Sequence, residues 1–333
     1  RAFVLIVPLA ILAAGPAADA QQPGKVYRIG TLGNVPPITP ELKRYGDALL
    51  QGLREHGFVQ GQNLVIERRY AEGRAERFAE FAAEHVRNRV DVIFAVGPQA
   101  AIAAARATKT IPIVFWGVGW PVEHGLASSL ARPGGNVTGM TFLTGPEVAT
   151  KQLEFLKEIA LKTARLAWIT SMTTLKDVAG RRVVVAPPVL EAAARTLGME
   201  LHEFPVRQPE DFDAAFTRIL ESRMDAVGLI GDVLTYAARK RIVEFANRSG
   251  LPSTFGMKDF VVEGGLLSYS ADHVEAFRKS GTYVGRILKG SKPGDLPIEQ
   301  PMKFELVVNA KTAKALGLTI PPSVLIRADE VIQ

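Results

Sequence analysis

The chain contains no cysteine, so it has no disulfide, no thiol nucleophile and no cysteine for lipid attachment. It also lacks the GxxxxGK[ST] phosphate loop, the HExxH zinc motif and the GxSxG nucleophile elbow. Its five histidines, at positions 56, 85, 124, 202 and 273, do not have the spacing of metal ligands. From these absences we predict a protein that is not an enzyme and that needs neither a cofactor nor a metal.

Long apolar runs are also missing beyond the first twenty residues, so no later segment is predicted to span a bilayer. The run at residues 2–14 is shorter than a membrane span and leads into Gly15, Pro16 and the small-residue sequence Ala18-Asp19-Ala20. This pattern is typical of a secretory signal peptide cleaved after Ala20, and a single membrane anchor is the alternative. We therefore predict that residues 1–20 are removed and that the remaining chain lies in the periplasm.

Acidic residues are fewer than basic ones, 34 against 40, which gives a formal net charge of +6. The basic residues are scattered, and the doublets Arg68-Arg69 and Arg181-Arg182 are too short for a nucleic-acid-binding arm. We expect a solvated basic surface and no nucleic-acid partner, with a weak preference for anionic ligands as the alternative.

Apolar runs and helical patterns alternate through two similar halves of the chain. In the first half, strands are predicted at 26–32, 63–70, 91–96, 111–118 and 137–142, with helices at 41–56, at 74–89 and after the turn Gly97-Pro98-Gln99. In the second half, strands are predicted at 165–170, 200–206, 225–230, 253–256, 265–268 and 304–308, with helices at 147–159, 189–197, 209–222, 234–248, 272–288 and 310–316. The pattern predicts an α/β fold of two doubly wound parallel-sheet lobes joined by a hinge. We assign lobe 1 to residues 25–143 plus 272–298, and lobe 2 to residues 144–271 plus 299–333.

Open α/β sheets bind ligands at the carboxyl ends of their strands. In the stretch 111–139 a predicted strand is followed by a glycine-rich turn with Trp120 and Pro121, then by a predicted short helix and a PGGN turn. We interpret Trp120 as part of a ligand site, with a structural role as the alternative. The adjacent Glu123 and His124 are interpreted as a solvated helix start rather than as an acid–base pair.

Other candidate ligand residues also follow predicted strands. They are Asn34, Gly97, Pro98, Gln99, Ala100 and Thr141 in the first lobe, and Ser171, Thr174, Asp232, Phe255, Met257 and Tyr269 in the second. Gln99 and Ala100 begin a predicted helix, whose backbone N–H groups suit a carboxylate. Asp232 suits either an ammonium group or the cap of the following helix, and Tyr269 suits either ligand stacking or a structural role.

Several blocks of the chain resemble the tryptophan/tyrosine-type substrate-binding proteins of ABC transporters. They include GFVQGQNLVIERRYAEG at 57–73, GLASSLARPGGNVTG at 125–139, RKRIVEFANRSGLPSTFG at 239–256 and the segment 303–332. The resemblance covers nearly the whole chain after residue 20. It implies a type 1 periplasmic binding protein fold that closes on a small molecule and presents it to an ABC permease in the inner membrane.

The chain departs from this family where a ligand is expected. After the IPIVF strand the family usually has Asp-Pro-Val, and here Trp120 stands in place of the aspartate. Either the ligand lacks an amino group, or Asp232 pairs with that group, or the indole face holds it by a cation–π contact. Ser270 and residues 171–174 also differ from the family pattern. We predict a monomer that binds a small aromatic or apolar carboxylate, including an aromatic amino acid, with a module that presents the solute to a membrane receptor as the alternative.

Overall fold

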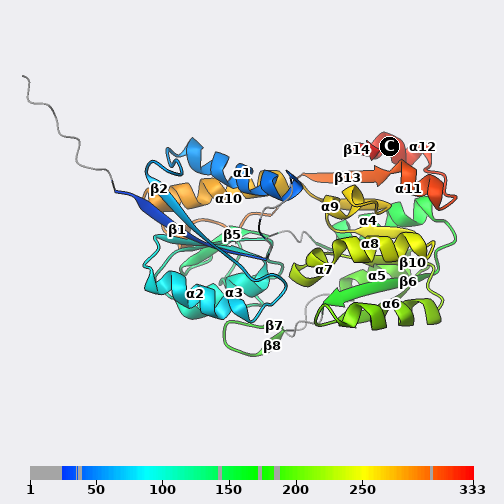
Figure 1. Cartoon of the computed structure of the whole chain (residues 1–333), viewed down its shortest axis with the longest axis horizontal. Helices are drawn as coiled ribbons and strands as arrows, with labels where there is room; N and C mark the ends of the chain where they lie inside the picture. Colours follow the sequence, from blue (N-terminus) through cyan, green and yellow to red (C-terminus); the bar gives the residue numbers. More distant parts are fainter. Residues whose placement is uncertain are drawn as a thin grey trace, which may run out of the picture.

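The computed structural model describes residues 25–34, 36, 40–141, 145–171, 175–183, 188–300 and 303–333. These residues form two lobes that lie side by side along the long axis of the molecule, each built on one large β-sheet (Figure 1). The predicted signal peptide at 1–20 and the candidate Thr174 lie outside the described residues. Within the described part of the chain, no helix has the length and apolar character of a membrane span.

The first lobe is built on a parallel five-stranded sheet with the order β2-β1-β3-β4-β5. Its strands are β1 (Tyr27–Gly33), β2 (Leu64–Tyr70), β3 (Val92–Val96), β4 (Ile113–Trp116) and β5 (Val137–Met140). The central strands are short apolar runs because helices cover both faces of a parallel sheet. Helices α1 (Pro40–Glu55) and α10 (His273–Leu288) pack on one face, and α2 (Arg77–Arg87) and α3 (Pro98–Ala107) pack on the other.

The second lobe is built on a seven-stranded sheet with the order β14-β13-β12-β11-β10-β6-β9. Five strands are parallel: β6 (Arg165–Ser171), β9 (Glu200–Val206), β10 (Ala226–Leu229), β11 (Ser253–Phe255) and β12 (Leu267–Ala271). At one side, β13 (Phe304–Asn309) runs antiparallel to β12, and β14 (Glu330–Ile332) forms the edge. Helices α4 (Gly145–Ile159) and α5 (Pro188–Thr196) cover one face, and α6 (Asp211–Glu221) and α8 (Arg239–Arg248) cover the other. The two-lobed α/β fold predicted from the sequence is therefore confirmed.

Smaller elements complete the described part of the chain. They are the hairpin of β7 (Leu175–Lys176) and β8 (Arg182–Val183), the helices α7 (Val233–Ala237), α9 (Lys258–Val262), α11 (Ala310–Ala315) and α12 (Pro322–Arg327), and the 3-10 turn η1 (Pro293–Asp295). The hairpin packs on the first lobe, where the Val178 N–H donates to the carbonyl of His124 at 3.0 Å. The segment between β6 and α5 therefore contacts the first lobe at this hairpin.

Helix α10 follows the parallel strands of the second lobe in sequence but packs against α1 of the first. A Cβ atom built on Gly52 would lie 2.0 Å from the carbonyl oxygen of Arg278, and one built on Gly281 would lie 2.2 Å from that of Leu49. The two helix backbones are thus in direct contact, which only glycine permits. After α10, a bridge between Met140 and Glu299 ties the chain to the end of β5. We keep 25–143 plus 272–298 and 144–271 plus 299–333 as the proposed lobe boundaries.

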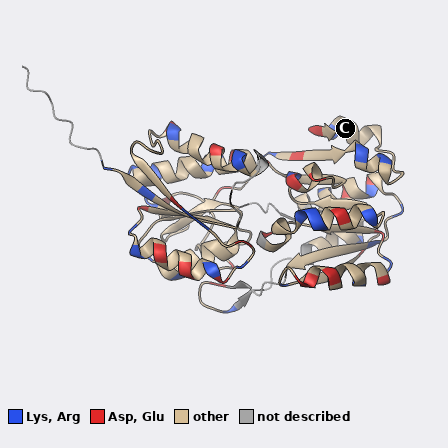
Figure 2. Cartoon of the chain, viewed as in Figure 1, with Lys and Arg blue, Asp and Glu red and all other residues tan. Residues whose placement is uncertain are grey.

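Basic and acidic residues are interspersed on the outer helices of both lobes (Figure 2). Several of them form exposed ion pairs, such as Arg241 with Asp213 at 2.6 Å on neighbouring helices. Each exposed pair contributes at most about 1 kcal/mol to stability. The fold is therefore held mainly by the apolar layers between each sheet and its helices.

Two of the predicted helices are wrong in detail. The short helix expected after Trp120 does not form: residues 121–125 are turns, and residues 126–136 contain no helix. Trp120 has a φ of 48° and Gly125 a φ of 71°, left-handed conformations that interrupt an α-helix. The helix expected at 234–248 is divided into α7 and α8, which meet at Ala238.

Candidate functional site

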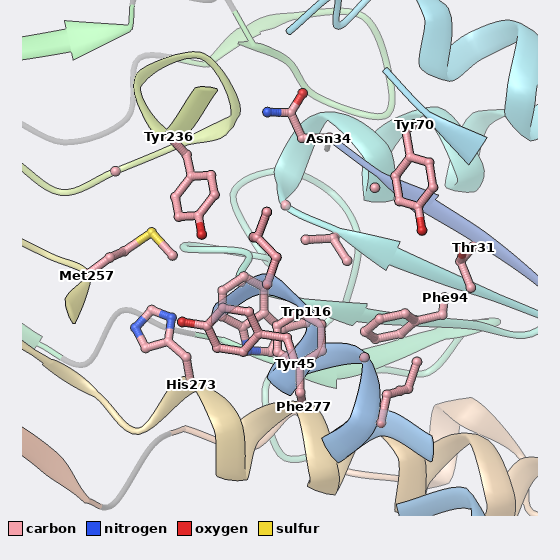
Figure 3. A pocket seen from close by; sticks show the side chains of 18 of the residues that line it. Thr31, Asn34, Tyr45, Tyr70, Phe94, Trp116, Tyr236, Met257, His273 and Phe277 are labelled. Atoms are coloured by element: carbon pink, nitrogen blue, oxygen red, sulfur yellow. The ribbon is translucent and has the colours of Figure 1, made fainter. Parts of the chain in front are cut away.

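A cavity of about 450 Å³ lies between the lobes at the carboxyl ends of their strands (Figure 3). Its wall in the first lobe includes Asn34 after β1, Gly97 after β3 and Trp116 at the end of β4, and its wall in the second lobe includes residues 230–232 after β10 and Met257 after β11. The strand order reverses between β1 and β3 and again between β6 and β10. Open α/β sheets bind ligands at such reversals, and the volume is within the usual range for small-molecule sites.

Aromatic rings from four elements form one side of the cavity. The Trp116 ring centroid lies 4.6 Å from that of Phe277 and 5.1 Å from that of His273. Phe277 also contacts Tyr45, at 5.1 Å, and Phe94, at 5.8 Å between ring centroids. A ligand ring packed on this surface would gain about 0.5–1.5 kcal/mol per aromatic contact beyond the area that it buries.

The N-terminus of helix α3 reaches the wall of the cavity through Gly97 and Pro98. Gly97 has a φ of 85°, which a residue with a Cβ atom rarely adopts, and its N–H donates to the carbonyl of Trp116 at 2.8 Å. Pro98 is the first helical residue, where its missing N–H costs nothing. The turn therefore directs the positive end of a ten-residue helix toward the cavity, where it favours a carboxylate.

Asp232 lines the cavity and also caps helix α7. Its Oδ1 accepts hydrogen bonds of 2.8 Å from both the N–H and the hydroxyl of Thr235, and the Asp232 N–H donates to that hydroxyl oxygen at 2.8 Å. Burial raises the pKa of the carboxyl. The cap predicted from the sequence is therefore present, and pairing of Asp232 with a ligand ammonium group stays a prediction.

A buried carboxylate joins the two lobes beside the cavity. Asp259, on α9 of the second lobe, is 2% exposed. It accepts hydrogen bonds from the Tyr45 hydroxyl at 2.6 Å and from the Arg44 guanidinium at 3.2 Å, both on α1 of the first lobe. Burial, reinforced by the charge of Asp259, raises the pKa of the cavity phenols Tyr45 and Tyr236. Both phenols are thus neutral hydroxyl groups at neutral pH.

His273 lies at the start of α10, directly after the capping residue Asp272. Burial lowers its pKa to about 4, so the imidazole facing the cavity is neutral at neutral pH. Its Nδ1 is buried and has no hydrogen-bond partner in the part of the chain that the structure describes. Among the same residues, no group of three or more His, Asp or Glu side chains is arranged to hold a metal ion.

The structure brings some of the predicted ligand residues to the cavity and places others elsewhere. Those that line it are Asn34, Gly97, Pro98, Asp232 and Met257. The described residues that do not line it are Gln99, Ala100, Trp120, Thr141, Ser171, Phe255 and Tyr269. A ligand role for this second group, and for Thr174, stays a prediction.

Core packing explains the position of two of these residues. Phe255 is fully buried and stacks on Phe260 with ring centroids 4.7 Å apart, inside the second lobe. Tyr269 packs against Phe155 and Phe304, with centroid distances of 5.3 and 5.7 Å. Phe255 is the last residue of β11 and Tyr269 lies in the middle of β12, and both rings pack among neighbouring side chains of their own lobe.

Sequence reasoning missed every ring of the aromatic wall. Trp116 is the last residue of β4, whereas the predicted strand ran to residue 118, so Trp116 was assigned to the strand interior. The next aromatic residue, Trp120, was chosen in its place. His273 and Phe277 are four residues apart on α10 and therefore share one helix face, a signal that was present in the sequence.

Comparisons with known proteins agree with this geometry. The model of the family described as "ABC transporter substrate binding protein" matches residues 39–332. A tyrosine-binding protein of Clostridioides difficile (strain R20291) is 25% identical over 279 residues, which cover 84% of this chain and 78% of that protein. A solved structure of a conserved domain protein from Vibrio cholerae has a TM-score of 0.82 at 28% identity, covering 92% of this chain and 100% of the other. An ABC domain from Streptococcus pneumoniae in complex with L-Trp has the same TM-score at 27% identity, covering 92% and 99%.

Proposed function

Because this chain belongs to the family of ABC transporter substrate-binding proteins, we propose that it is the periplasmic solute-binding component of an ABC importer. Its ligand is a small aromatic or apolar carboxylate, including an aromatic amino acid. A monomer captures this ligand between its lobes and delivers it to a permease in the inner membrane. The family is one of binding proteins, so the chain is a binding protein rather than an enzyme.

The observation that carries the ligand assignment is the aromatic cavity with the N-terminus of α3 and the carboxylate of Asp232 on its wall. The ligand ring lies against Trp116 and Phe277, its carboxylate faces the start of α3, and an amino group, if present, faces Asp232. A volume of 450 Å³ lies within the range of about 300–1,000 Å³ that is usual for small-molecule sites, so the cavity has room for an aromatic amino acid.

What the relatives bind supports the same ligand class. One is named a tyrosine-binding protein, and the structure from Streptococcus pneumoniae holds L-Trp. The expected affinity follows from the cavity: burying an aromatic ring of about 150–250 Å² contributes about 4–6 kcal/mol. Hydrogen bonds to charged groups contribute about 1.5–3 kcal/mol each. After the cost of association, we expect a Kd in the micromolar range, which corresponds to about 8 kcal/mol.

Binding operates by a shift between lobe arrangements. A ligand that touches Trp116 in the first lobe and Asp232 or Met257 in the second favours the arrangement in which both walls are close together. The hydrogen bond between Tyr45 and Asp259 joins the lobes in the same arrangement. The permease then recognises the ligand-bound arrangement.

Isothermal titration calorimetry of the purified chain tests the ligand class. The panel contains L-tryptophan, L-tyrosine, L-phenylalanine and benzoate, with L-alanine and L-lysine as controls. At least one aromatic compound should bind with micromolar Kd, and the substitution Trp116→Ala should weaken its binding at least tenfold. Trp120→Ala is the matched variant, because Trp120 is half-buried but is not among the described residues of the cavity wall. Failure of every aromatic compound to bind would reject the assignment.

Uptake of the bound compound tests transport. Cells that lack this chain should lose high-affinity uptake of the radiolabelled ligand, and uptake should return when the chain is restored. Normal uptake by the deletion strain would favour the alternative of a sensor that presents the solute to a membrane receptor.

A further inference from the structure

The cavity does not end between the lobes but continues into the first lobe beneath helix α1. We name this extension the α1 arm, and it is lined by Thr31, Gly46, Leu49, Leu50, Ile66 and Phe94. Figure 3 shows Tyr236 and Met257 at one end of the cavity and Thr31, Tyr70 and Phe94 at the other, with Trp116, Tyr45 and Phe277 between them. The arm therefore leads away from the second lobe, past the aromatic wall.

Gly46 keeps the α1 arm open. A Cβ atom built on Gly46 would meet no atom within 4 Å, whereas one built on Gly52 in the same helix would meet the backbone of α10 at 2.0 Å. Glycine weakens the interior of a helix relative to alanine. The helix contact explains the glycine at position 52. At position 46 no neighbour requires a glycine, and the missing side chain leaves space that belongs to the cavity.

The chemistry of the arm favours an apolar group. Leu49 and Phe94 are buried, and Leu50 and Ile66 are half-buried, so its inner walls are mostly hydrocarbon, with hydroxyl groups only on Thr31 and Tyr70 among the described residues at that end. Exposed charges lie at its rim and have partners of their own: Lys43 pairs with Asp47 at 2.8 Å, and Arg68 donates to Gln60 at 3.1 Å. A charged ligand group between Leu49, Ile66 and Phe94 would lose water without facing an opposite charge on these inner walls.

We propose that the α1 arm takes the apolar end of an elongated ligand, and that Gly46 determines how far that end extends. This inference rests on the proposed function, because the polar head of the ligand stays between the start of α3 and Asp232. The ligand class is then narrowed to amino acids and carboxylates whose aryl or alkyl group is carried on an extended chain. Benzoate and other short acids would leave the arm empty.

Two ligand series with constant head groups test the proposal by calorimetry on the purified chain. One series is L-phenylalanine, L-homophenylalanine and L-2-amino-5-phenylpentanoate. The other is phenylacetate, 3-phenylpropanoate and 4-phenylbutanoate. Each added methylene that enters the arm should tighten binding about fourfold in the parent protein. The quantity compared is the ratio of Kd values between successive members, measured separately for each protein variant.

The substitution Gly46→Leu fills the arm, so binding should no longer tighten as the ligand becomes longer. The Kd values of successive members of each series should then be equal or rise. Gln51→Leu adds the same side chain at an exposed position of α1 and should keep the ratios of the parent. Should Gly46→Leu fail to fold, Ile66→Phe fills the arm from the opposite wall and should have the same effect.

The outcomes separate this proposal from the proposed function. If the shorter members bind the parent and longer ones bind no tighter, the arm is not a ligand site, and binding between the lobes stands. If the affinity of the Gly46→Leu variant still rises with the length of the ligand side chain, the proposal is also overturned. If no member of either series binds the parent, the arm proposal fails, and the proposed ligand class fails with it only if L-tryptophan, L-tyrosine and benzoate also do not bind.

Discussion

Two alanine substitutions at glycines of helix α1 should change the stability of the protein in opposite directions. Gly46 and Gly52 lie six residues apart in one helix, and neither has a positive φ. Alanine is therefore conformationally acceptable at both positions. Only the surroundings differ, since Gly46 faces the cavity and Gly52 contacts α10.

At Gly46 the added methyl group meets no atom, so the helix gains the propensity difference of about 0.8–1 kcal/mol between glycine and alanine. At Gly52 the same methyl would lie 2.0 Å from the carbonyl oxygen of Arg278 and 2.8 Å from the nitrogen of Thr282. Both are backbone atoms, so α1 and α10 must separate by more than 1 Å to restore an ordinary contact. Overpacking of this kind costs about 1–3 kcal/mol or more and outweighs the gain in propensity.

Urea unfolding followed by far-ultraviolet circular dichroism measures both effects. Gly46→Ala should raise the urea midpoint and Gly52→Ala should lower it, and the slope with urea should be unchanged in each case. A lower midpoint for Gly46→Ala would mean that the space beside Gly46 is filled in solution. An unchanged midpoint for Gly52→Ala would contradict the close contact between the two helices.

Three further predictions concern the polar groups around the cavity. Asp232→Asn keeps a good N-cap but removes the charge. In calorimetry it should weaken the binding of amino acids at least tenfold and leave the binding of carboxylates without an amino group little changed. Equal effects on both ligand classes would exclude pairing of Asp232 with an ammonium group. Tyr45→Phe removes the hydroxyl bonded to the buried Asp259 and should lower the free energy of unfolding by about 1.5–3 kcal/mol. An unchanged free energy of unfolding would show that this contact between the lobes contributes nothing to stability. Burial lowers the pKa of His273 to about 4, so this imidazole binds a proton more readily in the unfolded chain than in the folded one. The stability that neutral His273 contributes is therefore intact above about pH 6.5 and is lost progressively as the pH falls toward 4. His273→Asn should reduce this acid-side loss in urea unfolding series at pH 7, 5.5 and 4.5, and parallel pH curves for the two proteins would contradict the assignment.

The fold was predictable because the relevant signals are local. Apolar runs such as residues 92–96, bounded by turn residues, predict buried strands, and the alternation with helices predicts parallel crossovers. The antiparallel pairing of β13 with β12 was not predictable in this way. Its register depends on where the chain returns after α10, which is a property of the packed molecule.

The candidate site was predictable only in part. Strand ends supplied Asn34, Gly97 and Asp232, because the rule that ligands bind at carboxyl ends needs no tertiary information. A two-residue error in the end of β4 was enough to direct attention to Trp120 rather than Trp116.

Which side chains α1 and α10 contribute to the cavity depends on how the two helices are rotated against the sheet. Tyr45 and Asp259 meet across the lobes although they are 214 residues apart in sequence. Nothing in the sequence near either residue indicates the other. The same holds for the space beside Gly46, which exists only because the cavity passes under that helix face.

The most direct test of the central claim uses the fluorescence of a single tryptophan. The chain has three, at positions 116, 120 and 168, and Trp168 lies in the core of the second lobe. In the double variant Trp120→Phe, Trp168→Phe, Trp116 is the only tryptophan left to emit. Titration with a nonfluorescent aromatic ligand that calorimetry has shown to bind should change this emission saturably, with the calorimetric Kd. Unchanged emission at saturating ligand, together with a response from a variant that retains only Trp120, would contradict a site built on Trp116.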